Sequence, residues 1–244
     1  MSLVVGGLGN SWRKVVEEAL GSLVPVYDKM NKVMSFGKDI EWRKTGIKIA
    51  FKGGERILDA GCGPGVMAEV LKQVYPDAKL VLMDALWVML ETAKKRTRGF
   101  AQDYVRAVFE KLPFKDQSFD GIMMGFSFRD SKDMESALDE LARVLSPQGV
   151  LLIVDISKPD NVVARALIGF YWHYLVPVMA MLFAPRFWKH YKVLHTTYTK
   201  LPKNSQLKAL VQKRFEEVHM ITRMMGGLLI LVARKPQKTM TWRL

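Results

Sequence analysis

Apolar and polar residues alternate along the middle of the chain with two different periods. Short apolar or β-rich runs, typical of buried strands, occupy Arg56–Asp59, Lys79–Met83, Tyr104–Val108, Phe119–Met124 and Val150–Val154. Between them, apolar residues recur at helical spacing over Val66–Tyr75, Trp87–Arg96 and Met134–Leu145. Strands that alternate with crossover helices predict an α/β fold with a parallel sheet.

The two ends of the chain depart from this rhythm. Near the C-terminus, the strand-like runs Phe215–Thr222 and Leu228–Ala233 are joined through Gly226-Gly227. They predict an antiparallel hairpin, which brings the expected strands to seven. Residues 15–50 predict a pair of helices broken near Ser35-Phe36-Gly37.

Three alternate glycines, Gly61, Gly63 and Gly65, follow the first expected strand. Glycine removes the side chains that would block close backbone approach, and the helix that begins near Val66 directs its free N–H groups at the same place. The second expected strand ends in Asp84, roughly 20 residues later, where a carboxylate can accept hydrogen bonds from both hydroxyls of a ribose. Together these features predict a nucleoside ligand. For the glycines alone, a plain strand-to-helix turn is the alternative.

The residues around the turn narrow the choice of nucleoside. A dinucleotide fingerprint would need glycine where Val66 stands, and the sequence has no P-loop. Asp59, two residues before the first glycine, favours a cationic amino group over a phosphate. S-adenosylmethionine carries an ammonium, a sulfonium and a ribose but no phosphate. The turn therefore resembles motif I of class I methyltransferases.

The most apolar part of the chain is Val162–Pro185. It has no charged side chain between Arg165 and Arg186 if His173 is neutral, and it is about long enough to cross a bilayer. Its aromatic residues cluster at the middle, whereas those of a membrane span prefer the two interfaces. We expect a lid over an apolar substrate, with a membrane span and an ordinary core helix as alternatives.

The net charge of +13 points to a polyanionic partner, since a small-molecule enzyme does not need it. An anionic membrane face and nucleic acid are the two candidates, and a solvated surface with a basic bias is the alternative. No RNA-binding module is visible, so we expect peripheral membrane contact and no nucleic acid.

The number of cysteines and the N-terminal residues indicate the cellular compartment of the protein. Cys62 is the single cysteine, so no internal disulfide is expected, and no zinc-ligand spacing or other metal site is visible. The first residues, Met1–Gly7, lack the pattern of a secretory signal. We expect a cytoplasmic protein in contact with the membrane. The oligomeric state stays open, with a homodimer allowed.

A series of longer motifs follows in fixed order. They are Tyr27-Asp28-Lys29-Met30-Asn31-Lys32-Val33-Met34-Ser35-Phe36-Gly37, Trp42-Arg43, Leu112-Pro113-Phe114, Ser118-Phe119-Asp120, Phe126-Ser127-Phe128-Arg129-Asp130, Arg143-Val144-Leu145-Ser146-Pro147, Ser157-Lys158-Pro159 and Trp172-His173-Tyr174-Leu175-Val176-Pro177. Through these motifs, from Tyr27 to Arg234, the chain resembles the ubiquinone/menaquinone biosynthesis C-methyltransferase family.

The resemblance implies a class I methyltransferase fold. That fold is a Rossmann-like, seven-stranded, mostly parallel sheet with an antiparallel C-terminal hairpin, N-terminal helices and a helical insertion before the hairpin. It implies an enzyme that uses S-adenosylmethionine to methylate a ring carbon of a polyprenyl hydroquinone, such as demethylmenaquinol. Methylation of another small molecule is an alternative, because a fold does not fix its acceptor. A basic RNA-binding methyltransferase is another.

Several positions depart from the family's pattern. The glycine turn contains Cys62 and Pro64, and Val108 stands where many relatives place an acid or Asn that holds the adenine amino group. The family's Arg-Asn pair appears here as Arg129-Asp130, and its Pro-Gly-Gly turn contains Gln148. Cofactor use tolerates these changes, whereas the identity of the acceptor depends on them.

Two residues are the expected catalytic groups. By resemblance, Arg129 lies at the end of the fourth strand, where it can stabilise a phenolate. His173 is the expected base, because imidazole changes charge near neutral pH, and a structural role is the alternative. The acceptor is expected to contact Phe126, Phe128, Tyr171 and Trp172. The expected cofactor-binding residues are Tyr27, Asp59, Ala60, Gly61, Gly63, Gly65, Asp84, Ala85, Met89, Val108, Phe109 and Gly125.

The length of 244 residues suits a single methyltransferase domain with one sizeable core. We divide it into an N-terminal helical cap (15–50), a cofactor-binding core (51–157), an apolar helical insertion or lid (160–200), a C-terminal hairpin region (205–234) and a basic tail (235–244).

Overall fold

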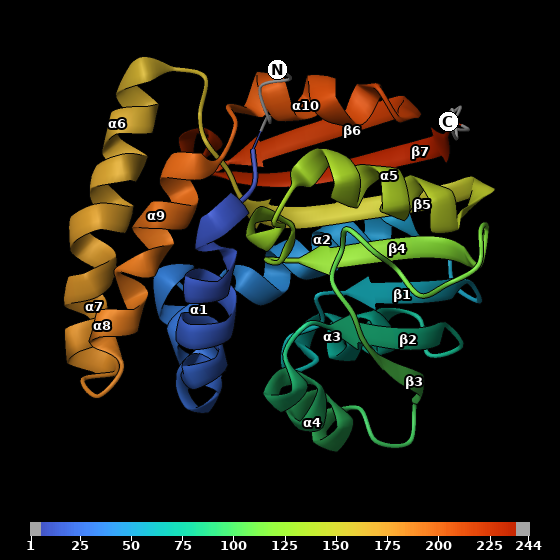
Figure 1. The fold of residues 1–244 in the computed structure, drawn as a ribbon, viewed down its shortest axis with the longest axis horizontal. Coiled ribbons are helices and arrows are strands. Elements are labelled where there is room, and N and C mark those ends of the chain that lie inside the picture. Colours follow the sequence, from blue (N-terminus) through green and yellow to red (C-terminus); the bar gives the residue numbers. More distant parts are fainter. Residues whose placement is uncertain (1–5, 238–244) are drawn as a thin grey trace.

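A seven-stranded sheet forms the centre of the protein, whose computed structural model describes residues 6–237. The strands are β1 (Arg56–Ala60), β2 (Lys79–Asp84), β3 (Ala101–Arg106), β4 (Phe119–Gly125), β5 (Leu145–Ile156), β6 (Phe215–Arg223) and β7 (Leu228–Pro236). Their order is β3-β2-β1-β4-β5-β7-β6, parallel from β3 to β5, with β7 antiparallel to both of its neighbours (Figure 1). The predicted parallel sheet and terminal hairpin are confirmed.

Strand β3 lies at Ala101–Arg106, whereas the pattern of apolar residues predicts Tyr104–Val108. This strand is at the edge of the sheet and pairs only with β2. Its polar residues Gln102 and Asp103 are exposed, so no apolar run marks its beginning. Val108 instead forms an isolated bridge with Lys111 in the loop that follows.

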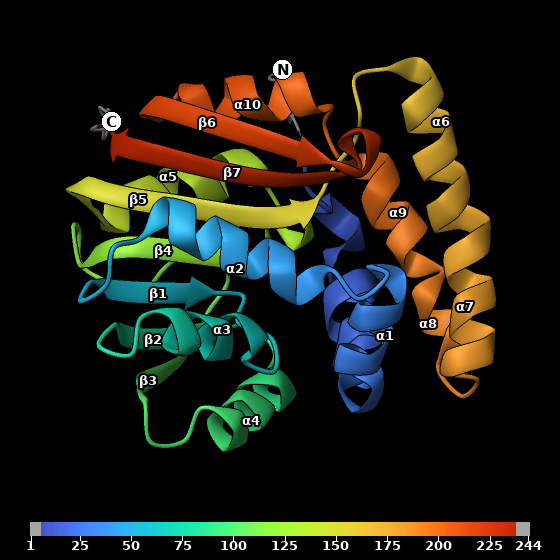
Figure 2. The same ribbon diagram turned by 180° about the vertical axis from the view of Figure 1, so that it is seen from behind.

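Helices cover both faces of the sheet. Helices α2 (Asp39–Ala50) and α3 (Val66–Val74) lie on one face, as Figure 2 shows, and α5 (Met134–Val144) and α10 (Asn204–Gln212) lie on the other. Helix α4 (Trp87–Arg96) packs beside β2 and β3. Buried apolar side chains fill both layers, so the site at the ends of the strands rests on a rigid base.

The N-terminal helices differ in part from the expected pair. Helix α1 (Tyr27–Met34) and α2 are broken at Ser35–Lys38, where Phe36 and Gly37 have positive φ, so the predicted break is confirmed. Before Tyr27 the chain forms irregular helical turns over Arg13–Val26, including π and 3₁₀ segments. Pro25 removes a backbone donor there and prevents a regular helix from starting earlier.

The apolar insertion is one long helical segment on the flank of the sheet. It comprises α6 (Val162–Phe170), a π turn over Tyr171–Leu175 and α7 (Val176–Phe183), followed by α8 (Trp188–Tyr191) and α9 (Val193–Lys200). Ile168, Trp172, Val176 and Ala180 recur every fourth residue and form its buried row. By length and composition, Val162–Phe183 could cross a membrane, with a mean hydropathy of 1.6, and 22% of it is buried against the protein. Residues 1–5 and the last part of the expected basic tail, 238–244, lie outside the described residues.

Candidate active site

Two cavities meet at the end of the sheet where the parallel strands finish. The first, of about 540 Å³, lies beside the glycine turn, and we name it the glycine-turn cavity. The second, of about 850 Å³ with its open mouth, lies under the insertion, and we name it the apolar cavity. Both volumes include the open space at the cavity mouths. Leu20, Tyr27 and Phe126 border both cavities, so these side chains form the boundary between them.

The glycine turn is shaped by its neighbours as well as by its own backbone. A Cβ added at Gly61 would lie 2.6 Å from Cβ of Ser127 and 2.8 Å from the ring of Phe109, so no side chain fits there. The backbone N–H groups of Gly61 and Cys62 donate to the carbonyl of Met83 at 2.8 and 2.9 Å, which ties the turn to the end of β2. The turn therefore presents bare backbone to the cavity.

Asp84 supports the turn from the next strand. One carboxylate oxygen accepts the N–H of Gly63 at 2.8 Å and the other accepts the N–H of Leu86 at 2.9 Å. Burial raises the pKa of Asp84 to about 6, and these N–H groups limit the rise. A carboxylate has about four lone-pair sites. Asp84 thus fixes two loops and retains acceptor capacity toward the cavity that it borders.

Asp59 lies fully buried behind the turn. Neither of its oxygens accepts a hydrogen bond of normal geometry from the described residues. Burial raises its pKa to about 7, the charge of Arg43 opposes the rise, and Asp84 adds to it. A buried acid without hydrogen bonds is costly, so a positive charge placed beside the turn would stabilise its ionised form.

Arg43, on α2, is a buried cation behind the same boundary. Its Nη1 donates to the carbonyl of Gly125 at 3.4 Å, and its guanidinium lies 4.7 Å from the centre of the Phe126 ring. A Cβ at Gly125 would lie 2.2 Å from that Nη1. Gly125 therefore makes room for Arg43 and does not itself border a cavity.

Arg129 and Asp130, which follow β4, form a charge cluster with Asp155 on β5. Nη1 of the Arg129 guanidinium pairs with Asp155 at 2.6 Å, and the backbone N–H of Arg129 also donates to Asp155 at 3.0 Å. Nε of Arg129 lies 3.8 Å from Oδ1 of Asp130. Burial raises the pKa of Asp130 to about 7, Arg129 opposes this rise, and Asp155 and Asp84 add to it. Arg129 borders the apolar cavity while Asp130 borders the glycine-turn cavity.

Tyr27 connects the two sides. A Cβ added at Gly63 would lie 3.5 Å from its hydroxyl, so the phenol lies against the glycine turn. Burial raises the pKa of Tyr27, and the charges of Arg43 and Arg129 oppose the rise. The hydroxyl is therefore a neutral donor in a positive field at the point where the two cavities meet.

Comparison with known proteins identifies the family. The model of the ubiE/COQ5 methyltransferase family matches residues 9–233. The chain belongs to the ubiE/COQ5 methyltransferase family. A protein named demethylmenaquinone methyltransferase from Thermus thermophilus is 33% identical over 192 residues, 78% of this chain and 87% of the relative. A Desulfotalea psychrophila protein named ubiquinone/menaquinone biosynthesis C-methyltransferase is 34% identical over 170 residues, 69% of each chain.

Solved structures support the fold of this methyltransferase. A crystal structure from Thermotoga maritima, titled as an SAM-dependent methyltransferase and possible histamine N-methyltransferase, matches with a TM-score of 0.60 at 20% identity. The match covers 89% of this chain and 98% of that one. At such identity the likeness concerns the fold alone, and it confirms the predicted class I methyltransferase architecture.

In the structure of this protein, the twelve expected cofactor-binding residues fall into two groups. Eight border the glycine-turn cavity: Tyr27, Gly61, Gly63, Asp84, Ala85, Met89, Val108 and Phe109. Asp59, Ala60, Gly65 and Gly125 lie behind it. Ala60 accepts the hydroxyl of Ser127 at 2.9 Å. A Cβ at Gly65 would meet Thr97 at 3.1 Å, so this glycine serves the packing of α3 against α4.

Phe128, an expected acceptor contact, and His173, the expected base, lie outside both cavities. Phe126, Tyr171 and Trp172 border the apolar cavity as expected, but Phe128 is buried in the core under α5, because it lies on a 3₁₀ turn that points inward. His173 is exposed on the outer side of the insertion and borders neither cavity. Its ring lies 4.3 Å from those of Tyr174 and His195. In this structure, His173 is therefore not placed to act as the catalytic base.

Many cavity residues were not predicted from the sequence, and they come from several separate segments of the chain. In the glycine-turn cavity these are Trp12, Val16, Leu20, Leu86, Ala107, Ser127 and Asp130. In the apolar cavity they include Leu23, Asn31, Met34, Trp42, Ile156, Ile168, Tyr191, Leu194 and Leu228. Asn31, Met34 and Trp42 stand in the N-terminal motifs, which was the available signal. Ser127 and Asp130 stand in the motif that begins at Phe126. Most of the others are apolar residues that resemble any core position.

Proposed function

We propose that this methyltransferase uses S-adenosylmethionine to methylate a ring carbon of a polyprenyl hydroquinone such as demethylmenaquinol. The observation that carries the proposal is the meeting of two unlike cavities across Tyr27 and Phe126. One has a glycine turn and buried acids, and the other has an apolar wall and one guanidinium. The names of the similar proteins from Thermus and Desulfotalea support the same acceptor class.

The glycine-turn cavity suits S-adenosylmethionine. Asp84 accepts the ribose hydroxyls with its remaining lone pairs, and Val108 and Phe109 form the apolar contact for adenine. The bare backbone at Gly61 and Gly63 lets the methionine part approach, and the buried charge of Asp59 behind the turn favours its ammonium. When bound, the cofactor supplies a methyl group activated by positively charged sulfur.

The apolar cavity suits a hydroquinone ring with its tail. Tyr171 and Trp172 of the insertion contact the ring, and Ile168 and Leu194 offer an apolar wall to the prenyl chain. Such a wall also excludes water. Charge on sulfur disappears during methyl transfer, so a dry site disfavours the charged reactants more than the products.

Asp130 is the proton acceptor in this proposal, in place of His173. A ring carbon becomes nucleophilic when the neighbouring hydroxyl loses its proton. Arg129 has guanidinium N–H groups that Asp155 does not use, and these stabilise the phenolate oxygen. The proton passes to the Asp130 carboxylate directly, through the Tyr27 hydroxyl or through one water. A pKa of about 7 suits a base at neutral pH.

After the methyl group is attached, the ring carbon still carries its original hydrogen. Loss of that proton restores the aromatic ring as a phenolate, which takes up one proton to give the methylated hydroquinone. The net products are the methylated hydroquinone, the demethylated cofactor and one proton. The same Asp130 carboxylate can release its first proton to solvent and receive the second. Asp155 does not serve this purpose, because it borders neither cavity and is paired with Arg129.

The quinones of cells with and without this protein test the acceptor class. In a host that lacks its own quinone methyltransferase, expression of this chain is expected to convert demethylated quinone to the methylated form, as measured by mass spectrometry. The Arg129→Ala variant, expressed at equal level, is the control. Unchanged quinones with a folded protein that binds S-adenosylhomocysteine would leave a class I methyltransferase of another small molecule. We place the protein in the cytoplasm at the membrane where such quinones reside.

A further inference from the structure

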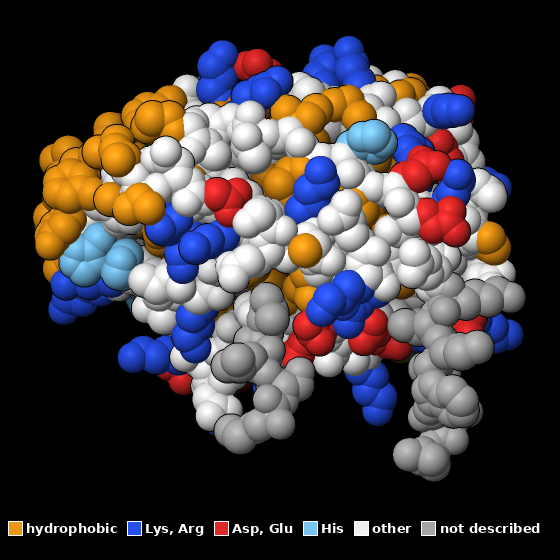
Figure 3. Space-filling view, turned by 90° about the horizontal axis from the view of Figure 1, so that it is seen from above, with side chains coloured by type: hydrophobic (Ala, Val, Ile, Leu, Met, Phe, Trp, Pro, Cys, Tyr) orange, Lys and Arg blue, Asp and Glu red, His pale blue; other side chains and the backbone are white. Residues whose placement is uncertain are grey.

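The outer side of the insertion is an unpartnered apolar surface. Along the helical segment 162–183, exposed apolar side chains recur three or four residues apart, opposite the buried row. They are Val162, Val163, Leu167, Phe170, Tyr174, Leu175, Val178, Met181, Leu182 and Phe183. We name this set the outer face. Figure 3 shows hydrophobic side chains gathered at one end of the molecule. Large contiguous apolar patches on a soluble surface mark an interaction site.

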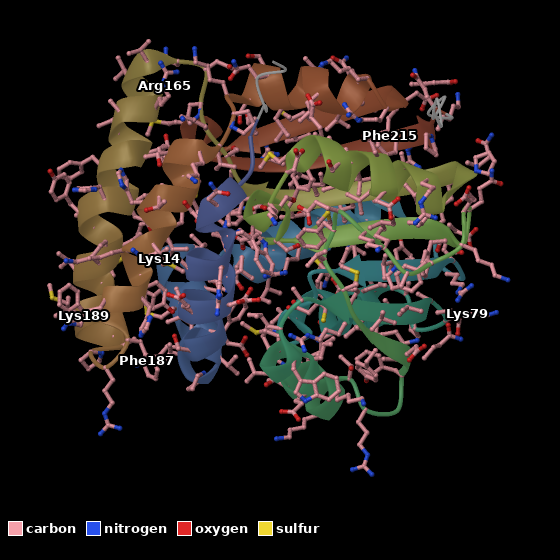
Figure 4. All side chains as sticks on the ribbon, in the orientation of Figure 1. Lys14, Lys79, Arg165, Phe187, Lys189 and Phe215 are labelled. Carbon is pink, nitrogen blue, oxygen red and sulfur yellow. The ribbon has the colours of Figure 1, made fainter. Side chains whose placement is uncertain are left out.

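Basic residues flank the outer face at both ends. Arg165 lies near its beginning, and Arg186, Lys189 and Lys192 follow its end, with no Asp or Glu from 161 to 192. Arg165 and Lys189 lie at opposite ends of the segment in Figure 4. Arg186, Lys189 and Lys192 are exposed. An apolar stripe between cations fits a surface of acyl chains bordered by anionic headgroups.

The same helix forms a wall of the apolar cavity. Ile168 and Trp172 on its inner side border that cavity, while Leu167 and Phe170, their neighbours in sequence, belong to the outer face. At the cavity's edge, the exposed ring of Phe36 lies 6.1 Å from Tyr171, and the exposed Met225 follows Met224 at the tip of the β6–β7 hairpin. Apolar surface thus continues from the outer face toward the cavity.

We propose that the outer face lies in the headgroup–acyl boundary of an anionic bilayer and that the polyprenyl hydroquinone enters the apolar cavity from this bilayer. The inference rests on the proposed function for its substrate, and on the outer face alone for its membrane contact. The segment lies in the plane of the membrane, because its inner row packs on the domain. An interfacial helix inserts its apolar side by about 5–10 Å.

A second copy of the chain is the rival occupant of this surface. Both ends of the segment carry positive charge, so two copies packed through their outer faces would bring like charges together in either a parallel or an antiparallel arrangement. An anionic bilayer instead neutralises both ends. The net charge of +13 acts in the same direction.

Sedimentation with vesicles tests the proposal without any substrate. We expect the protein to bind vesicles that contain phosphatidylglycerol at low salt and to detach in part as salt rises. The double variant Leu167→Glu/Leu182→Glu should bind about tenfold more weakly or worse, since both side chains leave the acyl region. Ile49→Glu is the matched control, because Ile49 is a similarly exposed apolar residue (41%, against 51% for Leu167) on α2.

Measurements of turnover distinguish membrane binding from the methyl-transfer chemistry. On a short-tailed, water-soluble hydroquinone, the double variant should methylate at the wild-type rate. On a long-tailed hydroquinone in vesicles, its rate should fall by about the same factor as its vesicle binding. Equal vesicle binding by wild type and double variant, or no binding by the wild type, would overturn the proposal. So would a wild-type dimer in light scattering that the double variant makes monomeric. If the wild type methylates no soluble hydroquinone, the proposed function fails, and sedimentation still decides the membrane contact.

Discussion

The glycine-turn cavity and the apolar cavity share one boundary, yet they are built in different ways. The first is formed mainly by loops that directly follow β1, β2, β3 and β4, and its acids Asp84 and Asp130 have raised pKa values because they are buried. The second is enclosed by α1, the insertion and the hairpin, which come together only in the folded chain. Under the proposed function, cofactor binding is thus tied to the sheet, while the choice of acceptor depends on segments added to it.

The two cavities also differ in the charged groups beside them. Behind the glycine turn, Asp59 has no hydrogen-bond partner of normal geometry among residues 6–237, so a cationic ligand completes that side. At the apolar cavity, Arg129 is already paired with Asp155, and its remaining donors can act on an oxyanion without a large cost of desolvation. Variants on either side should therefore separate cofactor affinity from turnover.

Arg129→Ala should have the largest effect on turnover. Removal of one preorganised donor from a developing oxyanion costs about 10²–10³ in rate. S-adenosylhomocysteine should still bind, because Arg129 does not border the glycine-turn cavity. The variant leaves the buried Asp155 without its cationic partner, so a loss of about 3–5 kcal/mol in unfolding free energy is also expected. Rates are therefore compared below the melting temperature of the variant.

Arg143→Ala is the control for Arg129→Ala. Arg143 also forms a network of ion pairs, with Glu140 and Asp116, but it borders neither cavity. Its loss should change stability and leave methylation near the wild-type rate. Near-normal turnover of Arg129→Ala on every hydroquinone tried would remove both the oxyanion role and the assigned acceptor.

Asp130→Asn should lower turnover by about 10²-fold at a pH above 7, toward the low end of the usual range for a lost general base. In the wild type, the rate should rise with pH through about 7 and then level off, because the carboxylate must be ionised to accept a proton. The variant should lose this rise. Asn occupies the position in the family's pattern, so the fold should tolerate it. A variant with an unchanged pH profile would show that Asp130 is not the base.

Asp84→Ala should weaken S-adenosylhomocysteine binding by about one to two decades in calorimetry. Hydrogen bonds to an ionised acceptor contribute roughly 1.5–3 kcal/mol. The loss includes the support that Asp84 gives to Gly63 and Leu86. Asp103→Ala, which removes an exposed carboxylate on β3, is the control and should bind normally. Equal affinity in Asp84→Ala, or equally tight binding of NADH, would contradict the cofactor assignment.

The last variant concerns the pH dependence of stability and affects neither turnover nor the choice of acceptor directly. Asp59 has a pKa of about 7 when folded and an ordinary value of 3.8. The folded protein therefore holds a proton that the unfolded chain releases, and this stabilisation is lost as pH rises from about 4 through 7. Each pKa unit is about 1.4 kcal/mol. Asp59→Asn should thus raise the melting temperature by several degrees near pH 8 and change little near pH 4.

Thermal melts of both proteins over that pH range check the prediction. His195 has a lowered pKa and opposes the trend in the wild type, but it is present in both proteins and cancels from the difference. If the difference between variant and wild type did not grow with pH, Asp59 would not be a protonated acid in the folded state.

The sequence contained most of the sheet and the cofactor side. The glycine turn, Asp84 and the β2 strand are local patterns, and each lies where its pattern predicts. Strand β3 was displaced because an edge strand needs no apolar run. That His173 lies outside both cavities could not be predicted, because periodicity does not reveal which side of an apolar helix faces the protein when both sides are apolar. Asp130 was noted only as a departure from the family's Arg-Asn pair, because the role that we propose for it depends on burial beside Arg129, which no local pattern shows.

Transfer of a labelled methyl group from S-adenosylmethionine to a short-tailed demethylated hydroquinone by the purified protein decides whether the two cavities act together. Nuclear magnetic resonance of the product locates the label. We expect one labelled methyl group on a ring carbon beside a hydroxyl, with the reaction lost in Arg129→Ala. Label on an oxygen, or no transfer to any hydroquinone by a protein that binds S-adenosylhomocysteine, would contradict the proposed function.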